Sequence, residues 1–214
     1  MEIASIILLA LAAYLIGCIS PSYYLVRYIK HVDIRRVGSN NAGTLNTFRE
    51  LGPWWALPVL LIDAGKGAIA VALPSLIGLP WWVVYITATC AILGHNWPVL
   101  LKFRGGKGAA SLIGICLAYV PLAGMVAAIP GVITVFLARN GIAGLVAGFA
   151  TLNILLVVAW VFDLNGLVPE ASWRQPLLCL PLTLFVAAIY GISIRGQLLE
   201  AIRQRSVRKA LYGP

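Results

Sequence analysis

The sequence predicts an all-α integral membrane protein in which residues 1–214 form a single transmembrane domain of seven helices. Composition is the first reason. Hydrophobic residues make up 61% of the chain and charged residues only 11%, whereas soluble domains carry roughly 25% charged residues. The chain therefore has too few polar groups to cover a globule in water. Long apolar stretches also alternate with basic connections, as in a chain that crosses a bilayer repeatedly.

Five apolar stretches are easily delimited along the chain. They cover residues 3–26, 53–77, 81–97, 141–162 and 176–194. The first stretch is broken near Ser20, Pro21 and Ser22, and a turn at residues 78–80 joins the second to the third. Two basic connections, residues 27–52 and 98–108, separate the spans, and a basic tail, residues 195–214, ends the chain.

Residues 108–138 are ambiguous, because each half is shorter than the ~20 residues that a full crossing needs. They could form two short spans that meet at Pro121, or one kinked helix. Two spans place fourteen of the sixteen Lys and Arg residues on one side of the membrane, whereas one helix moves the five cations of the tail to the other side. The positive-inside rule therefore favours seven spans, an external amino terminus and a cytoplasmic carboxyl terminus. The fourteen cations are Arg27, Lys30, Arg35, Arg36, Arg49, Lys102, Arg104, Lys107, Arg139, Arg195, Arg203, Arg205, Arg208 and Lys209.

Tryptophan and glycine residues fit the same layout. All seven Trp residues fall at the ends of the expected spans, where this residue is enriched in membrane proteins. Gly141, Gly144 and Gly148 form a stripe of small residues that would let another helix approach closely. We find no internal repeat, so the inverted-repeat architecture of many transporters lacks support.

Charge and cysteine content limit the partners. A net charge of +9 could indicate nucleic acid, but here the cations adjoin apolar spans. This placement favours anionic lipid head groups and phosphorylated substrates, so we expect membrane lipids and no nucleic acid as partners. The four cysteines lie singly in or beside apolar runs and predict neither a disulfide nor a metal site. They are Cys18, Cys90, Cys116 and Cys179.

The connection at residues 98–108 combines glycine with positive charge. Lys102, Arg104 and Lys107 lie within six residues, and Gly105, Gly106 and Gly108 let the backbone bend tightly. Peptide N–H groups of such a turn, placed at the start of the next helix, can bind phosphate oxygens. We therefore interpret this segment as one wall of a phosphate site.

The connection at residues 27–52 offers many short hydrogen-bond donors. Its residues 37–49 read VGSNNAGTLNTFR, in which hydroxyl and amide side chains alternate with glycines and Arg49 adds a guanidinium suited to phosphate. Taken alone, this segment could be an ordinary polar loop. Because the second glycine-and-cation connection lies on the same predicted side of the membrane, we expect the two to share an anion site.

Asp63 and Lys66 lie inside the second span. They are three residues apart and so share one helix face, where they can neutralise each other. The pair could be purely structural or could order the site from behind. His95, at the end of the third span, could hold or transfer a proton, whereas His31 in the basic connection is expected to be solvated.

Several catalytic motifs are absent from the sequence. Neither Gly106-Lys107 nor Gly65-Lys66 has the context of a nucleotide P-loop, and GxGxxG does not occur. GxSxG and HExxH are also missing. Neither histidine has an aspartate five residues later, so the HxxxxD motif of thioester-using glycerolipid acyltransferases is missing.

Three groups of residues resemble the signature loops of the acyl-phosphate-dependent glycerol-3-phosphate acyltransferases, the PlsY family of bacterial inner membranes. The first group is the segment 38–46 with Arg49, the second is Asp63 with Lys66 and Gly67, and the third is the segment 94–108, which reads GHNWPVLLKFRGGKG. The resemblance is strong over the first half of the chain.

The chain departs from the family pattern in two places. Asn40 stands where the family has Gly, and Thr44 lies one position from the family's Thr. Near the end of the last span, Tyr190 and Ser193 stand where the family has His and Asn, and after the span Glu200 is out of register with the family's Glu. The polar side chains of this last motif therefore differ from those of the family.

The resemblance implies transfer of a fatty acyl group from acyl phosphate to glycerol 3-phosphate, giving lysophosphatidic acid and phosphate, without metal or cofactor. It implies a multi-pass protein of the cytoplasmic membrane whose active-site connections 27–52 and 98–108 face the cytoplasm. His95 would orient a substrate or accept the hydroxyl proton, a role that the acyl phosphate itself could fill. The expected catalytic residues are Ser39, Arg49, His95 and Lys107. The expected substrate- and phosphate-binding residues are Gly38, Asn41, Gly43, Thr44, Asn46, Asp63, Lys66, Lys102, Arg104, Gly105, Gly106, Gly108 and Ser193.

The alternative interpretation is a non-enzymatic role, as a carrier of anions or phosphorylated metabolites or as a lipid-binding paralogue. A carrier needs a polar path across the membrane, and only Asp63 and Lys66 place ionisable groups inside the spans. Both polar connections face one side. The sequence therefore favours chemistry at one surface.

Overall fold

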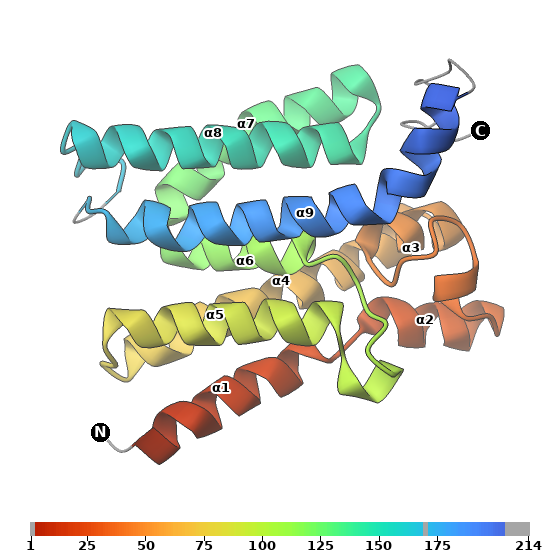
Figure 1. Ribbon diagram of the computed structural model, residues 1–214, viewed down its shortest axis with the longest axis horizontal. Coiled ribbons are helices and arrows are strands. Elements are labelled where there is room, and N and C mark those ends of the chain that lie inside the picture. The colour runs from red at the N-terminus through yellow and green to blue at the C-terminus, as the bar shows by residue number, and fades with distance from the viewer. Residues whose placement is uncertain (1–2, 169–170, 204–214) are drawn as a thin grey trace.

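The computed structural model describes residues 3–168 and 171–203, with side chains described as far as residue 195 of the last helix. The tail cations from Arg203 onward and Glu200 therefore lie outside the described side chains. Over the described range the secondary structure is helical (Figure 1). The helices are α1 (Ile3–Gly17), α2 (Pro21–Lys30), η1 (Ile34–Arg36), α3 (Thr44–Leu51), α4 (Pro53–Leu76), α5 (Trp81–Asn96), η2 (Val99–Leu101), α6 (Ala109–Tyr119), α7 (Pro121–Ala138), α8 (Gly141–Val161) and α9 (Arg174–Arg203).

Six helical segments of the described chain are long and apolar enough to cross a membrane. They are Ile3–Lys30, Pro53–Leu76, Trp81–Leu101, Pro121–Ala138, Gly141–Val161 and Arg174–Arg195. A further apolar helix, α6, is only 11 residues long. The all-helical membrane architecture is thus confirmed, with six spans by length and α6 as a shorter apolar segment.

Residues 108–138 form two helices. The backbone at Val120 has φ −136° and ψ 69°, far from helical values, and Pro121 begins α7. Proline has no N–H group and is well suited to the first position of a helix. The single kinked helix considered above therefore does not form.

The helices are held together at close backbone contacts. α4 packs on α6, α7 on α8 and α1 on α5. A Cβ added at Gly67 would overlap the carbonyl of Ser111, and one at Gly114 would overlap the carbonyl of Ala64, so only glycine allows α4 and α6 to approach this closely. Buried aliphatic side chains such as Ile92, Leu112 and Ile115 fill the core between α5, α6 and their neighbours.

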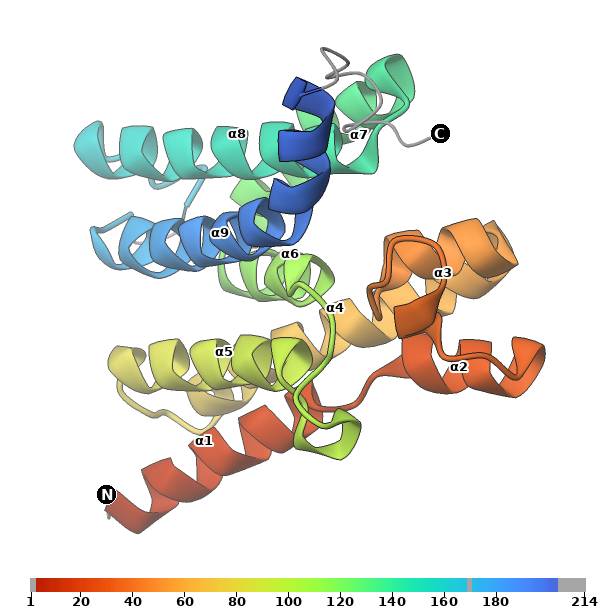
Figure 2. The same cartoon turned by 45° about the vertical axis from the view of Figure 1, so that its right-hand side comes forward.

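Polar connections gather at one end of the bundle. In Figures 1 and 2 the segment before α3, the α5–α6 connection and the α7–α8 turn lie at the same end, and α1 begins at the opposite end. The connection 27–52 also holds a helix, α3, which the sequence analysis treated as loop. Its apolar residues Leu45 and Phe48 are exposed, at 39% and 52%.

Candidate functional site

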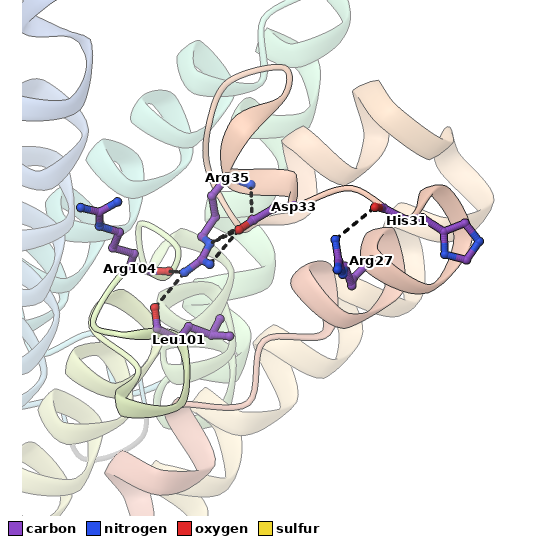
Figure 3. A network of polar contacts seen from close by, with 6 residues as sticks. All are labelled: Arg27, His31, Asp33, Arg35, Leu101 and Arg104. Carbon is purple, nitrogen blue, oxygen red and sulfur yellow. Dashed lines mark hydrogen bonds and ion pairs between the residues drawn. The ribbon is translucent and has the colours of Figure 1, made fainter.

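Arg35 joins the two basic connections (Figure 3). Its Nη1 donates to the carbonyl of Leu101 at 2.8 Å and to that of Arg104 at 3.2 Å. Its Nε and Nη2 also donate to the Asp33 carboxylate, at 2.8 to 3.2 Å. The hydrogen bond from Arg35 is the main reason that the pKa of Asp33 lies below its ordinary value, and the same contact raises the pKa of Arg35. The expected meeting of the two connections at one surface is therefore present.

A cavity of about 390 Å³ opens between these connections and the helices beneath them. Its polar end and its apolar end are continuous. The polar end is lined by Asn41, Gly43, Thr44, Asp63, His95, Lys107, Gly108 and Tyr190. The apolar end is lined by small and aliphatic residues of α6, α7 and α8, among them Ile113, Ala127, Ala128, Gly131, Val132, Gly144, Gly148 and Leu152.

Two helices begin at the polar end. α3 starts at Thr44 and α6 at Ala109, and both residues line the cavity. The first N–H groups of a helix have no partner inside the helix, and the helix dipole makes this end positive. Gly108, at φ +85°, forms the turn into α6, a left-handed conformation that favours glycine. The buried Thr44 Oγ1 has no hydrogen-bond partner in the described structure. This end of the cavity is therefore suited to bind an anion.

Two cations add to this positive field. Lys107 Nζ lies 4.7 Å from the centre of the Tyr190 ring. Burial lowers the pKa of Lys107, and the nearby positive charge of Arg49 lowers it further. Within the described residues no carboxylate forms an ion pair with either cation. Their charge is thus available to a ligand.

Gly105 and Gly106 have a different role from the one expected. Their N–H groups donate to the carbonyls of Asn96 and His95, at 3.0 and 2.9 Å, at the carboxyl end of α5. A Cβ at Gly106 would overlap His95 Nε2. These two amides are therefore used within the protein, which corrects the expectation that they bind phosphate oxygens. The amides at the start of α6 are the ones left for an anion.

Asp63, Lys66 and His95 form a buried cluster. Lys66 Nζ lies 2.8 Å from Asp63 Oδ1, which lies 3.4 Å from His95 Nδ1. Lys66 also donates to the carbonyls of Gly17 and Ile19, at 3.0 and 2.8 Å, where α1 ends. The predicted neutralisation of Asp63 by Lys66 is confirmed. Asp63 and His95 line the cavity, whereas Lys66 lies behind them.

Asn46 and Gly38 shape the first connection instead of lining the cavity. Asn46 is fully buried. Its Nδ2 lies 3.0 Å from each of three carbonyls, those of Ile34, Val37 and Asn41, and its Oδ1 accepts from the Ser39 amide at 2.9 Å. Gly38 has φ +57° and leaves no room for a side chain beside Asn46. The Asn46 side chain thus holds the loop in the conformation that presents Asn41 and Gly43.

Other expected site residues are also outside the cavity lining. Ser39 is half-buried, and its side chain does not line the cavity. Lys102, Arg104 and Ser193 are exposed, and in Figure 3 the Arg104 side chain points away from Arg35. Arg104 contributes its carbonyl to the contact between the connections. The side chain of His31 also points away from this network, while its carbonyl accepts from Arg27 at 3.1 Å.

Two parts of the site were missed by sequence reasoning. Tyr190 was treated only as a departure from a motif, yet its ring contacts Lys107. The stripe of Gly141, Gly144 and Gly148 was interpreted as helix packing alone. The stripe does pack, since Gly144 and Gly148 adjoin Gly131 of α7, but it also lines the apolar end of the cavity. Aromatic residues and small residues are both common in membrane helices, so neither type indicates a binding site by itself.

The residues of the site do not form a metal centre. In residues 3–168 and 171–203 no three His, Cys, Asp or Glu side chains lie close enough to share a metal ion. The positive charge that faces the cavity comes from Lys107 and the starts of α3 and α6. Arg49, one of the expected catalytic residues, is exposed and lies outside the cavity lining, although it is close enough to Lys107 to lower its pKa.

Comparison with known proteins identifies close relatives. Residues 7–202 match the family described as "Glycerol-3-phosphate acyltransferase". A glycerol-3-phosphate acyltransferase of Thermoanaerobacter pseudethanolicus is 41% identical over 155 residues, which covers 72% of this chain and 77% of the relative. "Glycerol-3-phosphate acyltransferase 2" of Dehalococcoides mccartyi strain CBDB1 is 42% identical and covers 96% of this chain and 97% of the relative. The crystal structure of PlsY, an integral membrane glycerol 3-phosphate acyltransferase, in its glycerol 3-phosphate form superimposes with a TM-score of 0.78 at 25% identity, covering 92% of this chain and 93% of PlsY.

Proposed function

Given that this chain belongs to the glycerol-3-phosphate acyltransferase family of membrane enzymes, we propose that it transfers a fatty acyl group from acyl phosphate to the primary hydroxyl of glycerol 3-phosphate. The products are lysophosphatidic acid and inorganic phosphate, and the reaction belongs to phospholipid biosynthesis. One observation carries the proposal. One cavity joins a polar end, with two helix starts and the half-buried Lys107, to an apolar groove.

Both substrates have chemistry that fits this cavity. Each carries a phosphate, and the acyl donor adds a hydrocarbon chain. Lys107, Arg49 and the starts of α3 and α6 provide the positive field for phosphate oxygens. The groove between α6, α7 and α8 offers an apolar wall to the chain, whose burial is favourable by roughly 0.8 kcal/mol for each methylene group.

Direct attack on the acyl donor fits the residues at the polar end. The hydroxyl oxygen of glycerol 3-phosphate bonds to the acyl carbon, the bond between that carbon and the phosphate oxygen breaks, and the hydroxyl proton leaves with the phosphate. Among the described residues that line the polar end there is no Ser or Cys side chain that could form an acyl-enzyme. Cys116 lines the cavity seven residues into α6, roughly 10 Å along the helix from its start.

The field at the polar end would accelerate this step. Negative charge accumulates on the departing phosphate, and fixed cations and N–H groups stabilise it without having to reorganise. Holding both phosphates in one cavity also places the hydroxyl beside the acyl carbon, which converts a bimolecular encounter into a reaction between bound groups. His95 would support the loop that carries Lys107, since its ring contacts Gly106.

The membrane arrangement that we propose has seven spans in one domain, with the amino terminus outside and the connections 27–52 and 98–108 in the cytoplasm. α1 begins at one end of the bundle and α9 reaches the other (Figure 1), which supports an odd number of crossings. α6 would be the seventh, short crossing. Basic residues of both connections lie at the end that holds the site, in agreement with the positive-inside rule.

The decisive experiment compares acyl donors on purified protein. Palmitoyl phosphate, palmitoyl-CoA and palmitoyl-acyl carrier protein are each supplied with glycerol 3-phosphate, and the product is identified by mass. We expect lysophosphatidic acid from palmitoyl phosphate, with release of one phosphate per product. Product from a thioester alone would contradict the proposed donor.

Two variants test the site. Lys107→Ala and Arg49→Ala should each reduce turnover at least tenfold, because each removes a charge from the phosphate-binding end. Unchanged turnover in both variants would remove the basis for this site. Uptake of labelled glycerol 3-phosphate into liposomes without a chemical product would instead indicate a carrier. Against a carrier stands the pairing of the buried charges Asp63 and Lys66 with each other.

A further inference from the structure

A buried carboxylate faces the polar end of the cavity with one oxygen unused. Asp63 is 1% exposed and lines the cavity. Its Oδ1 pairs with Lys66 at 2.8 Å. Its Oδ2 accepts no hydrogen bond from any residue that the structure describes. A buried carboxylate oxygen without a donor is costly, so this atom is suited to a donor that arrives with a ligand.

The neighbours of Asp63 are already committed. Lys66 Nζ donates to the carbonyls of Gly17 and Ile19 as well as pairing with Asp63. The His95 ring is enclosed by Asp63 on one side and Gly106 on the other. Asp63 Oδ2 is therefore the member of this cluster that remains for a ligand.

The chemistry of Asp63 Oδ2 determines which group of the substrates can bond to it. A carboxylate oxygen accepts hydrogen bonds and donates none. The phosphate group of glycerol 3-phosphate, as a dianion, has only acceptors and cannot satisfy it, and neither can an acyl chain. A hydroxyl of the glycerol unit can. Asp63 is thus suited to a hydroxyl donor, which glycerol 3-phosphate carries on its glycerol unit. Inorganic phosphate, as a dianion with a single proton, is a poor donor by comparison.

The position of Asp63 indicates which hydroxyl. The His95 ring separates the Asp63 carboxylate from Gly106, the residue next to Lys107. The carboxylate is therefore about one imidazole ring away from the segment that would bind the phosphate. In glycerol 3-phosphate the secondary hydroxyl is on the carbon next to the one that bears the phosphate, and so it lies closest to that segment.

We propose that Asp63 Oδ2 accepts a hydrogen bond from the secondary hydroxyl of glycerol 3-phosphate and so selects this acceptor over phosphates that lack the hydroxyl. The proposal rests on the proposed function, because it concerns the acceptor of that reaction. In this arrangement the primary hydroxyl stays free to attack the acyl carbon. Asp63 acts as a specificity-determining residue.

The test uses 3-hydroxypropyl phosphate, which lacks only the secondary hydroxyl. Binding of both compounds to the purified full-length protein is measured by calorimetry, and both are then assayed as acyl acceptors. The wild-type protein should bind glycerol 3-phosphate about tenfold to a hundredfold more tightly, the range expected for a buried hydrogen bond to a charged group. Equal dissociation constants would overturn the proposal.

Variants of Asp63 then locate the effect. Asp63→Leu combined with Lys66→Met removes both charges, so that no buried charge is left unpaired. We expect the preference for glycerol 3-phosphate to fall at least fivefold in this variant. Binding of inorganic phosphate checks that the polar end is still formed. Gly65→Ala, on the same helix with nothing within 4 Å of the added Cβ, is the control and should keep the wild-type preference.

The outcomes separate this proposal from the proposed function. If both compounds bind with the expected difference but neither is acylated, the acyl transfer is wrong and the hydroxyl contact stands. If both are acylated with equal efficiency and equal binding, the hydroxyl contact is wrong and acyl transfer stands. Should the double variant not fold, Asp63→Glu serves instead, because it moves the carboxylate by one methylene group. A preference unchanged in Asp63→Glu would contradict the proposal.

Discussion

The ammonium group of Lys107 lies 4.7 Å from the centre of the Tyr190 ring, so α9 holds the cation of the α5–α6 connection through an aromatic face. An interaction of this kind contributes about 0.5–2 kcal/mol. Tyr190 stands where the resemblance leads one to expect histidine. At this position the chain has an aromatic ring that contacts Lys107, the lysine that we propose to bind phosphate.

This contact predicts how Tyr190 variants behave. Tyr190→Ala should lower kcat/KM by a factor of about 2 to 30, the loss of one cation–aromatic contact. Tyr190→Phe keeps the ring and should stay within about twofold of the wild type. Steady-state kinetics with palmitoyl phosphate measure both. If phenylalanine were as damaging as alanine, the hydroxyl of Tyr190, and not its ring, would be the important group.

The lowered pKa of Lys107 predicts a pH dependence. A free lysine titrates near ~10.4, and burial together with Arg49 lowers the pKa of Lys107. If phosphate binding needs the charged form, kcat/KM should fall as the pH rises through this lowered pKa. Arg49→Gln removes one cause of the shift, so the midpoint of the alkaline limb should move to higher pH while activity falls overall. Lys107→Arg stays charged and should lose the limb. A midpoint that did not move in Arg49→Gln would assign the limb to another group.

The membrane-spanning part of the fold was predictable from hydropathy. The stretches expected at residues 53–77, 81–97 and 141–162 correspond to α4, α5 and α8 within one residue at each end, because long apolar runs bounded by Gly, Pro or Trp leave little choice of boundary. The break before Pro21 and the division at Pro121 were also visible, since proline removes a helical hydrogen bond.

The details of the site were less predictable, because they depend on contacts between distant segments. Sequence indicated that the glycine-rich segment was a phosphate loop, but not that the Gly105 and Gly106 amides bond to the end of α5. The sequence predicted a ligand-binding role for the Asn46 amide, but not its hydrogen bonds to three loop carbonyls. Tyr190 is 83 residues from Lys107, and no local pattern connects them. α3 had a local signal, Leu45 and Phe48 three positions apart after a glycine, which was outweighed by the polar residues around it.

The hydrogen bonds of Arg35 predict a loss of stability when this residue is replaced. Arg35→Gln removes donors from Asp33 and from the carbonyls of Leu101 and Arg104, so the two connections should separate. We expect a loss of about 1–2 kcal/mol in the free energy of unfolding, near the lower end of the range for hydrogen bonds to charged groups because the site is partly exposed. Thermal unfolding in detergent measures it.

The pH dependence of this loss has a defined sign. The pKa of Asp33 is lowered in the folded protein. Its stabilising contribution is therefore complete above the ordinary aspartate pKa of about 3.9 and is lost as the pH falls through the lowered pKa. The difference between wild type and Arg35→Gln should shrink below that pH. Arg36→Gln is the control, since Arg36 is exposed on the same turn. An equal loss in Arg36→Gln would indicate general charge effects instead of this network.

A side chain added at position 106 should have a strong steric effect. A Cβ at this position would overlap His95 Nε2, and His95 is fixed from its other side by Asp63. Gly106→Ala should therefore displace the loop that carries Lys107, raising KM for glycerol 3-phosphate at least tenfold while the protein still folds. Gly65→Ala, which meets nothing within 4 Å, should behave as wild type or gain up to about 1 kcal/mol of stability from helix propensity. Wild-type kinetics in Gly106→Ala would show that the His95 ring is free to move.

Substitution of two glycines of α8, Gly144 and Gly148, tests whether the apolar groove selects the acyl chain. At Gly148 an added Cβ would meet Ala127 O at 3.4 Å and Gly131 Cα at 3.7 Å, ordinary van der Waals distances, whereas at Gly144 it would lie 2.7 Å from Gly131 O. Gly148→Ala should therefore fold normally and narrow the groove, which lowers kcat/KM for long acyl phosphates more than for short ones. Gly144→Ala forces α7 and α8 apart, and its main effect should be on thermal stability. Kinetics with acyl phosphates of eight to eighteen carbons separate the two cases. A uniform loss over all chain lengths in Gly148→Ala would place the acyl chain elsewhere, because a narrowed channel penalises only the part of the chain that has to pass it.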